Sequence, residues 1–221
     1  GYNSSARSIT DCDNWADVIK TTGNCVGGII GRSEVVSGTW YIENCNNFGN
    51  ITGTRVSGIM GCLKYNGGTM YNCSNYGKIT GVSESAGGIM GMVYDVTKDT
   101  VINITSCKNY GEITGKGDDA AGILAYVANR CKYIRVTVSD CVNTGRITAN
   151  ATNLAGIAAR FDAAEPAEGY SDKKALVING CRNFGNTSSA GKFSGIVQKT
   201  NAGKTVVKNC VGVAGRNSVT Y

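Results

Sequence analysis

Cysteine is the side chain in this sequence most able to do chemistry, and its spacing limits what that chemistry can be. The chain has 10 cysteines and no histidine, and no C-x-x-C pair occurs, so the usual spacings of zinc sites and haem attachment are missing. Six cysteines recur in one local pattern: Cys45, Cys73, Cys107, Cys141, Cys181 and Cys210. Recurrence of this kind mostly marks a small residue in a tight interior position. We therefore expect a ladder of structural thiols, with no metal and no other cofactor.

Three further cysteines, Cys25, Cys62 and Cys131, lie outside that pattern. Stacked ladder cysteines would point the same way, which fits the dihedral angle of a disulfide poorly. The off-ladder cysteines are better candidates for a bridge. A disulfide between Cys25 and Cys62 is the pairing we favour, although spacing alone does not set connectivity.

Carboxylates are the other candidates for catalysis, and they are dispersed. Asp118 and Asp119 share one turn, and Asp162, Glu165 and Glu168 share one polar loop. Polysaccharide lyases and hydrolases built on parallel β-helices need clustered carboxylates with Arg or Lys. Without histidine, acid–base chemistry would require a carboxylate, Lys or Tyr with a shifted pKa, and nothing in the sequence arranges one. We predict no enzyme, with a polysaccharide-active β-helix as the alternative.

An aromatic residue recurs three positions after four of the ladder cysteines. These residues are Phe48, Tyr76, Tyr110 and Phe184, with Thr144 interrupting the series. Rings at equivalent positions of stacked repeats should pile up along a corner. Two interpretations stay open, simple packing and an exposed strip that binds sugar rings.

These residues belong to a repeat, C-x-N-x-G-x-I-T-G. It reads "CNNFGNITG" from Cys45, "CSNYGKITG" from Cys73 and "CKNYGEITG" from Cys107, and "CDNWADVIK" from Cys12 looks like a degenerate first copy. Intervals from Cys45 onward are 28, 34, 34, 40 and 29 residues, a period typical of solenoids. The asparagines of the motif suit turns, where an amide side chain bonds backbone groups. They are Asn47, Asn75, Asn109, Asn143 and Asn183.

Each repeat holds three strand-like pieces separated by Gly and Asn. Besides the motif, there is a glycine-led apolar stretch such as "GGIMG" (87–91) and a β-branched run such as "YIRVTVSDC" before each cysteine. Three short strands per unit predict one coil of a parallel β-solenoid. The predicted fold is all-β, a solenoid of about six coils, and a right-handed winding follows from the general preference of parallel crossovers.

Stacking of coils at about 4.8 Å should place equivalent apolar residues in columns. We expect three: Ile51, Ile79, Ile113 and Ile147; Ile29, Ile59, Ile89, Ile123, Ile157 and Ile196; and Ile42, Met70, Ile104, Val138, Ile178 and Val207. Members of the third column stand three residues before a cysteine. Because three is an odd step, a bend at the intervening Asn, Ser or Asp is needed to turn both inward.

The surface of the predicted solenoid is also patterned. Threonines should form an outward file, and Lys78, Glu112 and Arg146 should pair as neighbouring charges. The file comprises Thr52, Thr80, Thr114 and Thr148. A second apolar row suggests an outer face that the inserted loops, a flanking domain or a partner chain covers, and we favour the loops: Ile30, Met60, Met90, Leu124, Ala158 and Val197. All insertions, including the long one around Pro166, should project from one edge.

The first 24 residues should close the stack. In "DCDNWADVIKTTGN", Asp13 is a candidate helix cap, Trp15, Val18 and Ile19 a short helical turn, and Gly23 its end. We therefore predict that residues 1–24 form a helical N-terminal cap and a degenerate first coil. Residues 25–221 would form one continuous solenoid domain.

The repeats resemble the GLUG-type repeats of bacterial extracellular and cell-surface proteins. The resemblance rests on "GGIMG" and on C-x-N-[FY]-G-x-I-T-G, and spans about residues 25–210. It implies a stalk or adhesive module without catalytic residues. The sequence departs from the pattern at Ala125, Ala159 and Gln198, where the glycine after the apolar pair is replaced.

The charge and hydropathy of the sequence limit the classes of partner that we expect. The net charge of +6 comes without any run of Lys or Arg, and no apolar stretch approaches 18 residues, so we expect no nucleic acid and no membrane span. The chain opens on Gly1 without a signal peptide, and we expect an export signal to have been removed.

The predicted function is a non-catalytic extracellular or cell-surface module for adhesion, display or spacing. A carbohydrate-binding or carbohydrate-active β-helix is the alternative. Expected partners are host or bacterial glycans, surface proteins and flanking domains of a longer chain.

Overall fold

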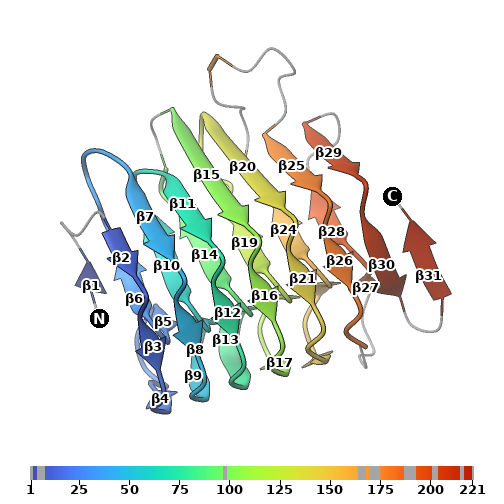
Figure 1. Ribbon diagram of the computed structural model, residues 1–221, viewed down its shortest axis with the longest axis horizontal. Helices are drawn as coiled ribbons and strands as arrows, with labels where there is room; N and C mark the ends of the chain where they lie inside the picture. Colours follow the sequence, from blue (N-terminus) through green and yellow to red (C-terminus); the bar gives the residue numbers. More distant parts are fainter. Residues whose placement is uncertain are drawn as a thin grey trace.

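The computed structural model describes residues 2–3, 8–96, 99–163, 168–169, 175–186, 193–200, 204–214 and 217–220 (Figure 1). Within these ranges the chain forms strands and no helix, so none of the described residues forms a helix that could span a membrane. The strands lie in parallel sheets that run along the stack. The all-β solenoid predicted from the repeat is confirmed.

Four sheets make up the solenoid, and we name them A to D. Sheet A contains, in order, β1 (Tyr2–Asn3), β6 (Ile30–Ser33), β10 (Met60–Lys64), β14 (Met90–Tyr94), β19 (Leu124–Val127), β24 (Ala158–Phe161) and β28 (Val197–Thr200). Sheet B contains β2 (Ser8–Thr10), β7 (Trp40–Glu43), β11 (Gly68–Tyr71), β15 (Thr100–Thr105), β20 (Ile134–Ser139), β25 (Leu176–Asn179) and β29 (Thr205–Lys208).

Sheet C carries the asparagine motif, and sheet D forms an arm beside it. Sheet C contains β3 (Asp13–Asn14), β8 (Asn46–Asn47), β12 (Ser74–Asn75), β16 (Lys108–Asn109), β21 (Val142–Asn143), β26 (Arg182–Asn183), β30 (Val211–Ala214) and β31 (Asn217–Thr220). Sheet D contains β4 (Val18–Ile19), β5 (Val26–Gly27), β9 (Ile51–Ser57), β13 (Ile79–Gly87), β17 (Ile113–Gly115), β18 (Asp119–Ala121), β22 (Ile147–Ala149), β23 (Asn153–Ala155) and β27 (Phe193–Ser194). Each coil visits B, C, D and A in turn, which gives six full coils in the described chain and part of a seventh.

A left-handed residue before each ladder cysteine sets the phase of the chain. Asn44, Asn72 and Asp140 have φ of 53°, 51° and 55°, and Asp11, Ser106, Gly180 and Asn209 adopt the same conformation at equivalent positions. Non-glycine residues enter this region rarely, and Asn and Asp tolerate it best. The bend lets Ile42 and Cys45, three residues apart, both reach full burial. The predicted bend is thereby confirmed.

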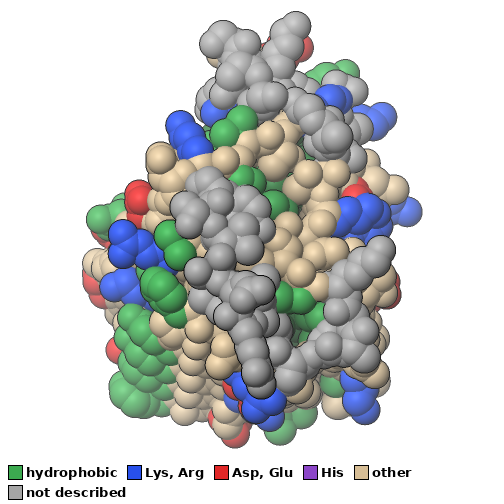
Figure 2. Space-filling view, turned by 90° about the vertical axis from the view of Figure 1, so that its right-hand side faces the viewer, with side chains coloured by type: hydrophobic (Ala, Val, Ile, Leu, Met, Phe, Trp, Pro, Cys, Tyr) green, Lys and Arg blue, Asp and Glu red, His purple; other side chains and the backbone are tan. Residues whose placement is uncertain are grey.

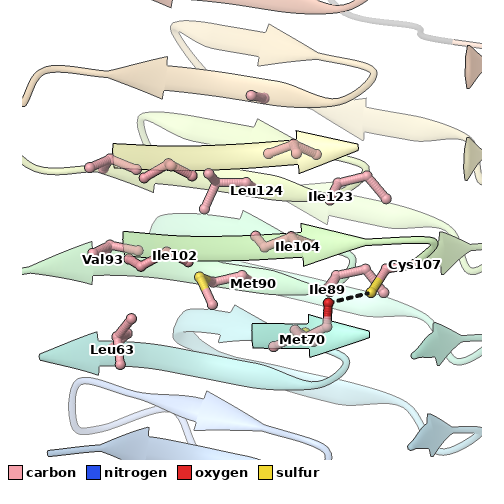
Figure 3. Close-up of a cluster of buried hydrophobic side chains, with 14 of the residues drawn as sticks. Leu63, Met70, Ile89, Met90, Val93, Ile102, Ile104, Cys107, Ile123 and Leu124 are labelled. Carbon is pink, nitrogen blue, oxygen red and sulfur yellow. Dashed lines mark hydrogen bonds between the residues drawn. The ribbon is translucent and has the colours of Figure 1, made fainter. Parts of the chain in front are cut away.

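The described interior holds two large apolar cores and a small cluster of Ala121, Ala155 and Ala159. The main core lies between sheets A, B and C and holds the ladder cysteines with the Ile42 and Ile59 columns (Figure 3). A second, smaller core lies inside the arm of sheet D and holds the Ile51 column against Val56 and its equivalents. The strands that contain Gly53 and Gly81 turn back on themselves and enclose this second core, which the sequence did not predict.

The expected second apolar face of the glycine-led stretch is wrong. Ile59 and Met60 both belong to the main core, as do Ile89 and Met90. The chain bends just before the strand of sheet A begins, at residues 58–59 and 88–89, so consecutive side chains both point inward at this corner. No covering loop is needed there.

The predicted helical cap is also wrong. Asp13 and Asn14 form β3 in register with Asn46 and Asn47, and Val18 of β4 pairs with Ile51. Instead of capping a helix, the Asp13 carboxylate accepts a hydrogen bond of 2.9 Å from the Asn46 side chain. Pairing with the next coil outweighs the weak local helix signal. This segment is the first coil of the stack.

The fully described connections from sheet A to the next strand of sheet B, residues 34–39, 65–67 and 128–133, lie at the same edge of the stack (Figure 1). This agrees with the expectation for these insertions. Pro166 and Glu165 lie outside the described residues, while the backbone N–H of Glu168 donates to the Asp99 carboxylate at 2.6 Å. In sheet C the last described strand, β31, pairs antiparallel with β30, whereas the other described pairs of that sheet are parallel.

Candidate functional site

The predicted aromatic residues form a stack of rings along sheet C. Ring centroids are 4.9 Å apart between Phe48 and Tyr76 and 4.8 Å between Tyr76 and Tyr110, with interplanar angles of 7° and 12°. Trp15, which was not predicted as a member, stacks on Phe48 at 4.0 Å and 9°. The signal was present, because Trp15 stands three residues after Cys12 just as Phe48 follows Cys45.

The inner rings of the stack are exposed to solvent only at their edges. Tyr76 and Tyr110 are 47% and 42% exposed, yet both faces of Tyr76 are covered by neighbouring rings. Trp15 is 72% exposed and is stacked on one side only. Beyond Tyr110, Thr144 occupies the next rung and Phe184 lies on the rung after it, 52% exposed. Figure 2, which faces the C-terminal end, shows hydrophobic side chains gathered at one edge of the molecule.

The motif asparagines form a buried ladder of amides. Each Nδ2 donates to the Oδ1 of the next coil: Asn14 to Asn47 at 2.7 Å, Asn47 to Asn75 at 2.7 Å, Asn75 to Asn109 at 2.8 Å, Asn109 to Asn143 at 2.7 Å and Asn143 to Asn183 at 2.7 Å. The same Nδ2 also donates to the carbonyl two residues later, as Asn75 does to Gly77 at 2.9 Å. The expected turn contact is present, and the amide chain is additional.

This ladder stands at the neck between the two cores. Asn75 binds the carbonyl of Gly77, where the chain leaves for the arm, and its Oδ1 would lie 2.4 Å from a Cβ placed on Gly58, where the chain returns. Any side chain at Gly58 would therefore displace the amide. A Cβ on Gly77 would meet the carbonyl oxygen of Gly49 at 1.9 Å. Glycine at both positions is required by close approach.

The ladder cysteines are free thiols buried in the main core. Their Sγ–H groups donate to backbone carbonyls, as Cys107 does to Thr105 at 3.4 Å and to Met70 at 3.7 Å (Figure 3). Cys12 continues the ladder at the N-terminal end, where it is exposed. Burial raises the pKa of the off-ladder Cys131 thiol to about 11, which disfavours the reactive thiolate. The ladder contributes packing and weak hydrogen bonds.

The structure joins Cys25 and Cys62 in a disulfide with a Cα–Cα distance of 5.5 Å. It links the chain just before β5 of the first coil to sheet A of the second coil. A hollow of about 410 Å³ adjoins it, with Lys20, Asn24 and Arg32 in its lining.

The threonine file lies on the outer side of the arm, in register from coil to coil. Its members are half-buried, and the Thr114 hydroxyl donates to the Thr80 hydroxyl at 3.2 Å. A shallow hollow of about 450 Å³ runs beside Thr80, Thr114 and Thr148. On the same arm Lys78 and Glu112 pair at 3.1 Å, in agreement with the expected contact of opposite charges.

An ionic cluster that the sequence did not predict lies between the arm and sheet A. Arg160 contacts Asp162 at 2.5 Å through one terminal nitrogen and at 2.6 Å through Nε, and its other terminal nitrogen lies 3.8 Å from Asp119. The guanidinium also lies 4.6 Å from the centroid of the Tyr126 ring. Asp119 accepts a 2.7 Å hydrogen bond from Asn153. Two dispersed carboxylates are thus gathered around Arg160, and Lys199 lies 3.5 Å from Asp162.

Burial controls the protonation of this cluster. The Asp119 side chain is 3% exposed, and burial raises its pKa to about 6, although Asn153 and Arg160 act to lower it.

The sequence did not reveal this cluster because the contact depends on how strands of different coils pair. Asp119 pairs with Asn153 along the arm, and Arg160 pairs with Tyr126 along sheet A. The register defines a row along each sheet, and the arm brings the two rows face to face.

A second charged group occupies the same facing rows nearer the N-terminus. Arg32, Arg55 and Lys64 lie 5.6, 5.4 and 5.9 Å from the centroid of the Tyr94 ring. Arg55 also pairs with Glu84 at 2.6 Å. Cations over an aromatic face are favourable, more so when partly desolvated. In both groups the charges are held by partners within the protein.

Among the described residues no three His, Cys, Asp or Glu side chains are grouped so as to hold a metal ion. No family model, curated protein or solved structure matches this chain.

Proposed function

We propose that the chain is a non-catalytic repeat module that serves adhesion, display or spacing outside a bacterial cell. The resemblance of its repeats to GLUG-type repeats supports the extracellular setting, and a right-handed winding is part of the same proposal. Such a module must present or separate other groups at a fixed distance. A stack of coils joined through continuous side-chain ladders suits that role.

The observation that carries the proposal is the use of the aromatic ring faces. Sugar recognition needs an open face on which a pyranose can lie, whereas the faces of Phe48 and Tyr76 are occupied by neighbouring rings. The amides of the asparagine ladder are likewise satisfied by one another. The ring faces and amides that could bind a ligand instead contact the neighbouring coils.

A carbohydrate-binding module is the second candidate, and Trp15 is the residue that favours it. Its ring is 72% exposed and stacks on Phe48 by one face. The glycan contact would then lie at the N-terminal end of the stack, with Tyr76, whose two faces are covered, contributing only its ring edge and hydroxyl. Phe184, apart from the four-ring stack, is a lesser candidate.

Polysaccharide cleavage is supported least. The carboxylates Asp119 and Asp162 meet at Arg160, but the guanidinium forms an ion pair with each of them, and Asp119 is almost fully enclosed. An acid and a base for glycoside cleavage need access to the glycosidic bond. We propose that this cluster stabilises the junction between the arm and sheet A.

A glycan array with the intact chain tests the proposal, with Trp15→Ala and Tyr76→Ala as a matched pair. If the chain is the non-catalytic module proposed first, none of the three proteins should bind a glycan above background. Binding lost with Trp15→Ala and retained with Tyr76→Ala would establish the second candidate instead. Binding lost only with Tyr76→Ala would contradict the account of covered ring faces.

A further inference from the structure

The outer side of sheet B is a broad strand surface along one side of the stack (Figure 1). From the second coil to the seventh, its outward side chains form two long rows in register, and all but Val177 are exposed or half-buried. One row holds Tyr41, Thr69, Asn103, Thr137, Val177 and Val206. The other holds Glu43, Tyr71, Thr105, Ser139, Asn179 and Lys208.

The charges on this surface are ordered along the stack. The second row begins with Glu43 in the second coil and ends with Lys208 in the seventh, and the four side chains between them are uncharged. The neighbouring outer row of sheet C has the same polarity, with Asp13 in the first coil and Lys108 and Arg182 in the fourth and sixth. Neither Glu43 nor Lys208 forms an ion pair with another described residue. Each of these two charges is available to a partner.

We propose that this surface binds a second copy of the chain, turned antiparallel about a two-fold axis that runs along the strands between β15 and β20. The axis places the second coil of one copy over the seventh coil of the other. Glu43 then faces Lys208 of the partner subunit, and the symmetric contact repeats on the other side of the axis. A parallel arrangement would set each of these charges against its own kind, which is unfavourable.

The same axis gives the exposed aromatic side chains of sheet B a surface to cover. Tyr41 faces Val206 of the partner subunit, and Tyr71 faces Asn179 of the partner subunit. The two tyrosines are 37% and 40% exposed in the single chain. Tyrosine is enriched in protein interfaces because its ring buries apolar area while its hydroxyl can bond a polar neighbour. These two rings are therefore the anchors of the proposed contact.

Like charges do not meet near the axis. Lys108 of the fourth coil faces Val142 of the partner subunit's fifth coil, because these two positions are equivalent along sheet C. Arg135 likewise faces Val101 of the partner subunit. Asp140, at the bend after sheet B, faces the uncharged serine that occupies the same position one coil earlier. The centre of the surface is thus electrically compatible with its own copy.

The size of the surface sets the expected strength of the contact. Six strands about 4.8 Å apart span roughly 24 Å, which is narrow for a stable interface, so we expect a dissociation constant on the order of 10–100 μM at low ionic strength. Antiparallel pairing would join modules that extend from two facing surfaces, and many weak contacts would add there. That setting rests on the proposed adhesive function, whereas the contact itself can be measured on the purified chain.

Sedimentation equilibrium at low ionic strength tests the contact through paired charge reversals. The wild type should show a monomer–dimer equilibrium. Glu43→Lys and Lys208→Glu should each weaken it at least about tenfold, because both ion pairs become like-charge contacts. The double variant E43K/K208E should recover the wild-type association. An equimolar mixture of the two single variants should recover it too, because each reversed charge then meets its opposite across the axis.

Asp118→Lys and Lys116→Glu are the matched controls, because they reverse charge at exposed residues of the arm and should leave the association unchanged. Recovery in the mixture also shows that the single variants are folded. The proposal is overturned if the wild type stays monomeric at about 1 mM, if the single variants associate like the wild type, or if the mixture does not recover. Species larger than a dimer would also overturn it, because a two-fold contact closes on itself. The glycan array reads the proposed function separately, since no glycan is present in this experiment.

Discussion

Tyr76 and Tyr110 stack with ring centroids 4.8 Å apart and planes 12° from parallel, so each ring covers a face that the other would need for a sugar. The same distance is close to the spacing of neighbouring strands, about 4.8 Å. The ring stack is therefore a direct consequence of placing an aromatic residue once per coil. Its first effect is on stability and register.

Removal of an inner ring should cost more than removal of an end ring. Tyr76→Ala loses two stacking partners, and Tyr110→Ala loses the one partner that the structure describes. At about 0.5–1.5 kcal/mol per aromatic pair beyond the buried area, Tyr76→Ala should lower the free energy of unfolding by about 1 kcal/mol more than Tyr110→Ala. Urea denaturation of the two variants measures the difference. Equal losses would mean that the rings are neighbours without mutual stabilisation.

The disulfide should hold the first coil to the second. Replacing Cys25 and Cys62 together by Ser removes a link across 37 residues of sequence. We expect the free energy of unfolding to fall by about 2–4 kcal/mol. Amide exchange should accelerate most at Val26 and Gly27, which follow Cys25 in β5. Cys12→Ser, an exposed thiol, is the control and should change neither quantity; uniform acceleration in all coils would contradict a local role.

Stability should depend on pH through Asp119. Its pKa is raised to about 6 in the folded chain against an ordinary value of 3.8, so the folded state holds the proton more tightly. The stabilisation is complete below about pH 4 and is lost as pH rises through about 6, at a cost of roughly 3 kcal/mol. Asp119→Asn should remove this dependence. Calorimetry at pH 4 and pH 7 tests the sign: a wild type that gains stability over Asp119→Asn as pH rises would refute it.

Features repeated in every coil were predictable from the sequence, and those created between coils were not. The Ile51 and Ile42 columns follow from spacing, and the left-handed Asn44 follows from the odd step to Cys45. The Asp119–Arg160 contact depends on the register of two sheets and on the arm that brings their rows face to face. Local signals around Asp13 indicated a helix, because the pairing with Asn46 that outweighs them lies in another coil.

The asparagine ladder is intermediate between these cases. A motif asparagine in each coil predicted a turn, and the amide does bind the carbonyl two residues on, as Asn109 binds Gly111 at 3.0 Å. Its complete burial and its bond to the next amide were not predicted, because a periodic polar residue does not reveal which way it points. A polar residue repeated beside two apolar columns was the available signal.

The free energy of unfolding of Asn109→Ala tests the central claim most directly, which is that satisfied side-chain ladders join the coils into one rigid module. Asn109 accepts from Asn75 at 2.8 Å and donates to Asn143 at 2.7 Å, and its removal leaves buried groups without partners. We predict a loss of roughly 3–5 kcal/mol. The exposed Asn150→Ala, as control, should change stability by less than about 0.5 kcal/mol. Similar small losses for both variants would contradict the account.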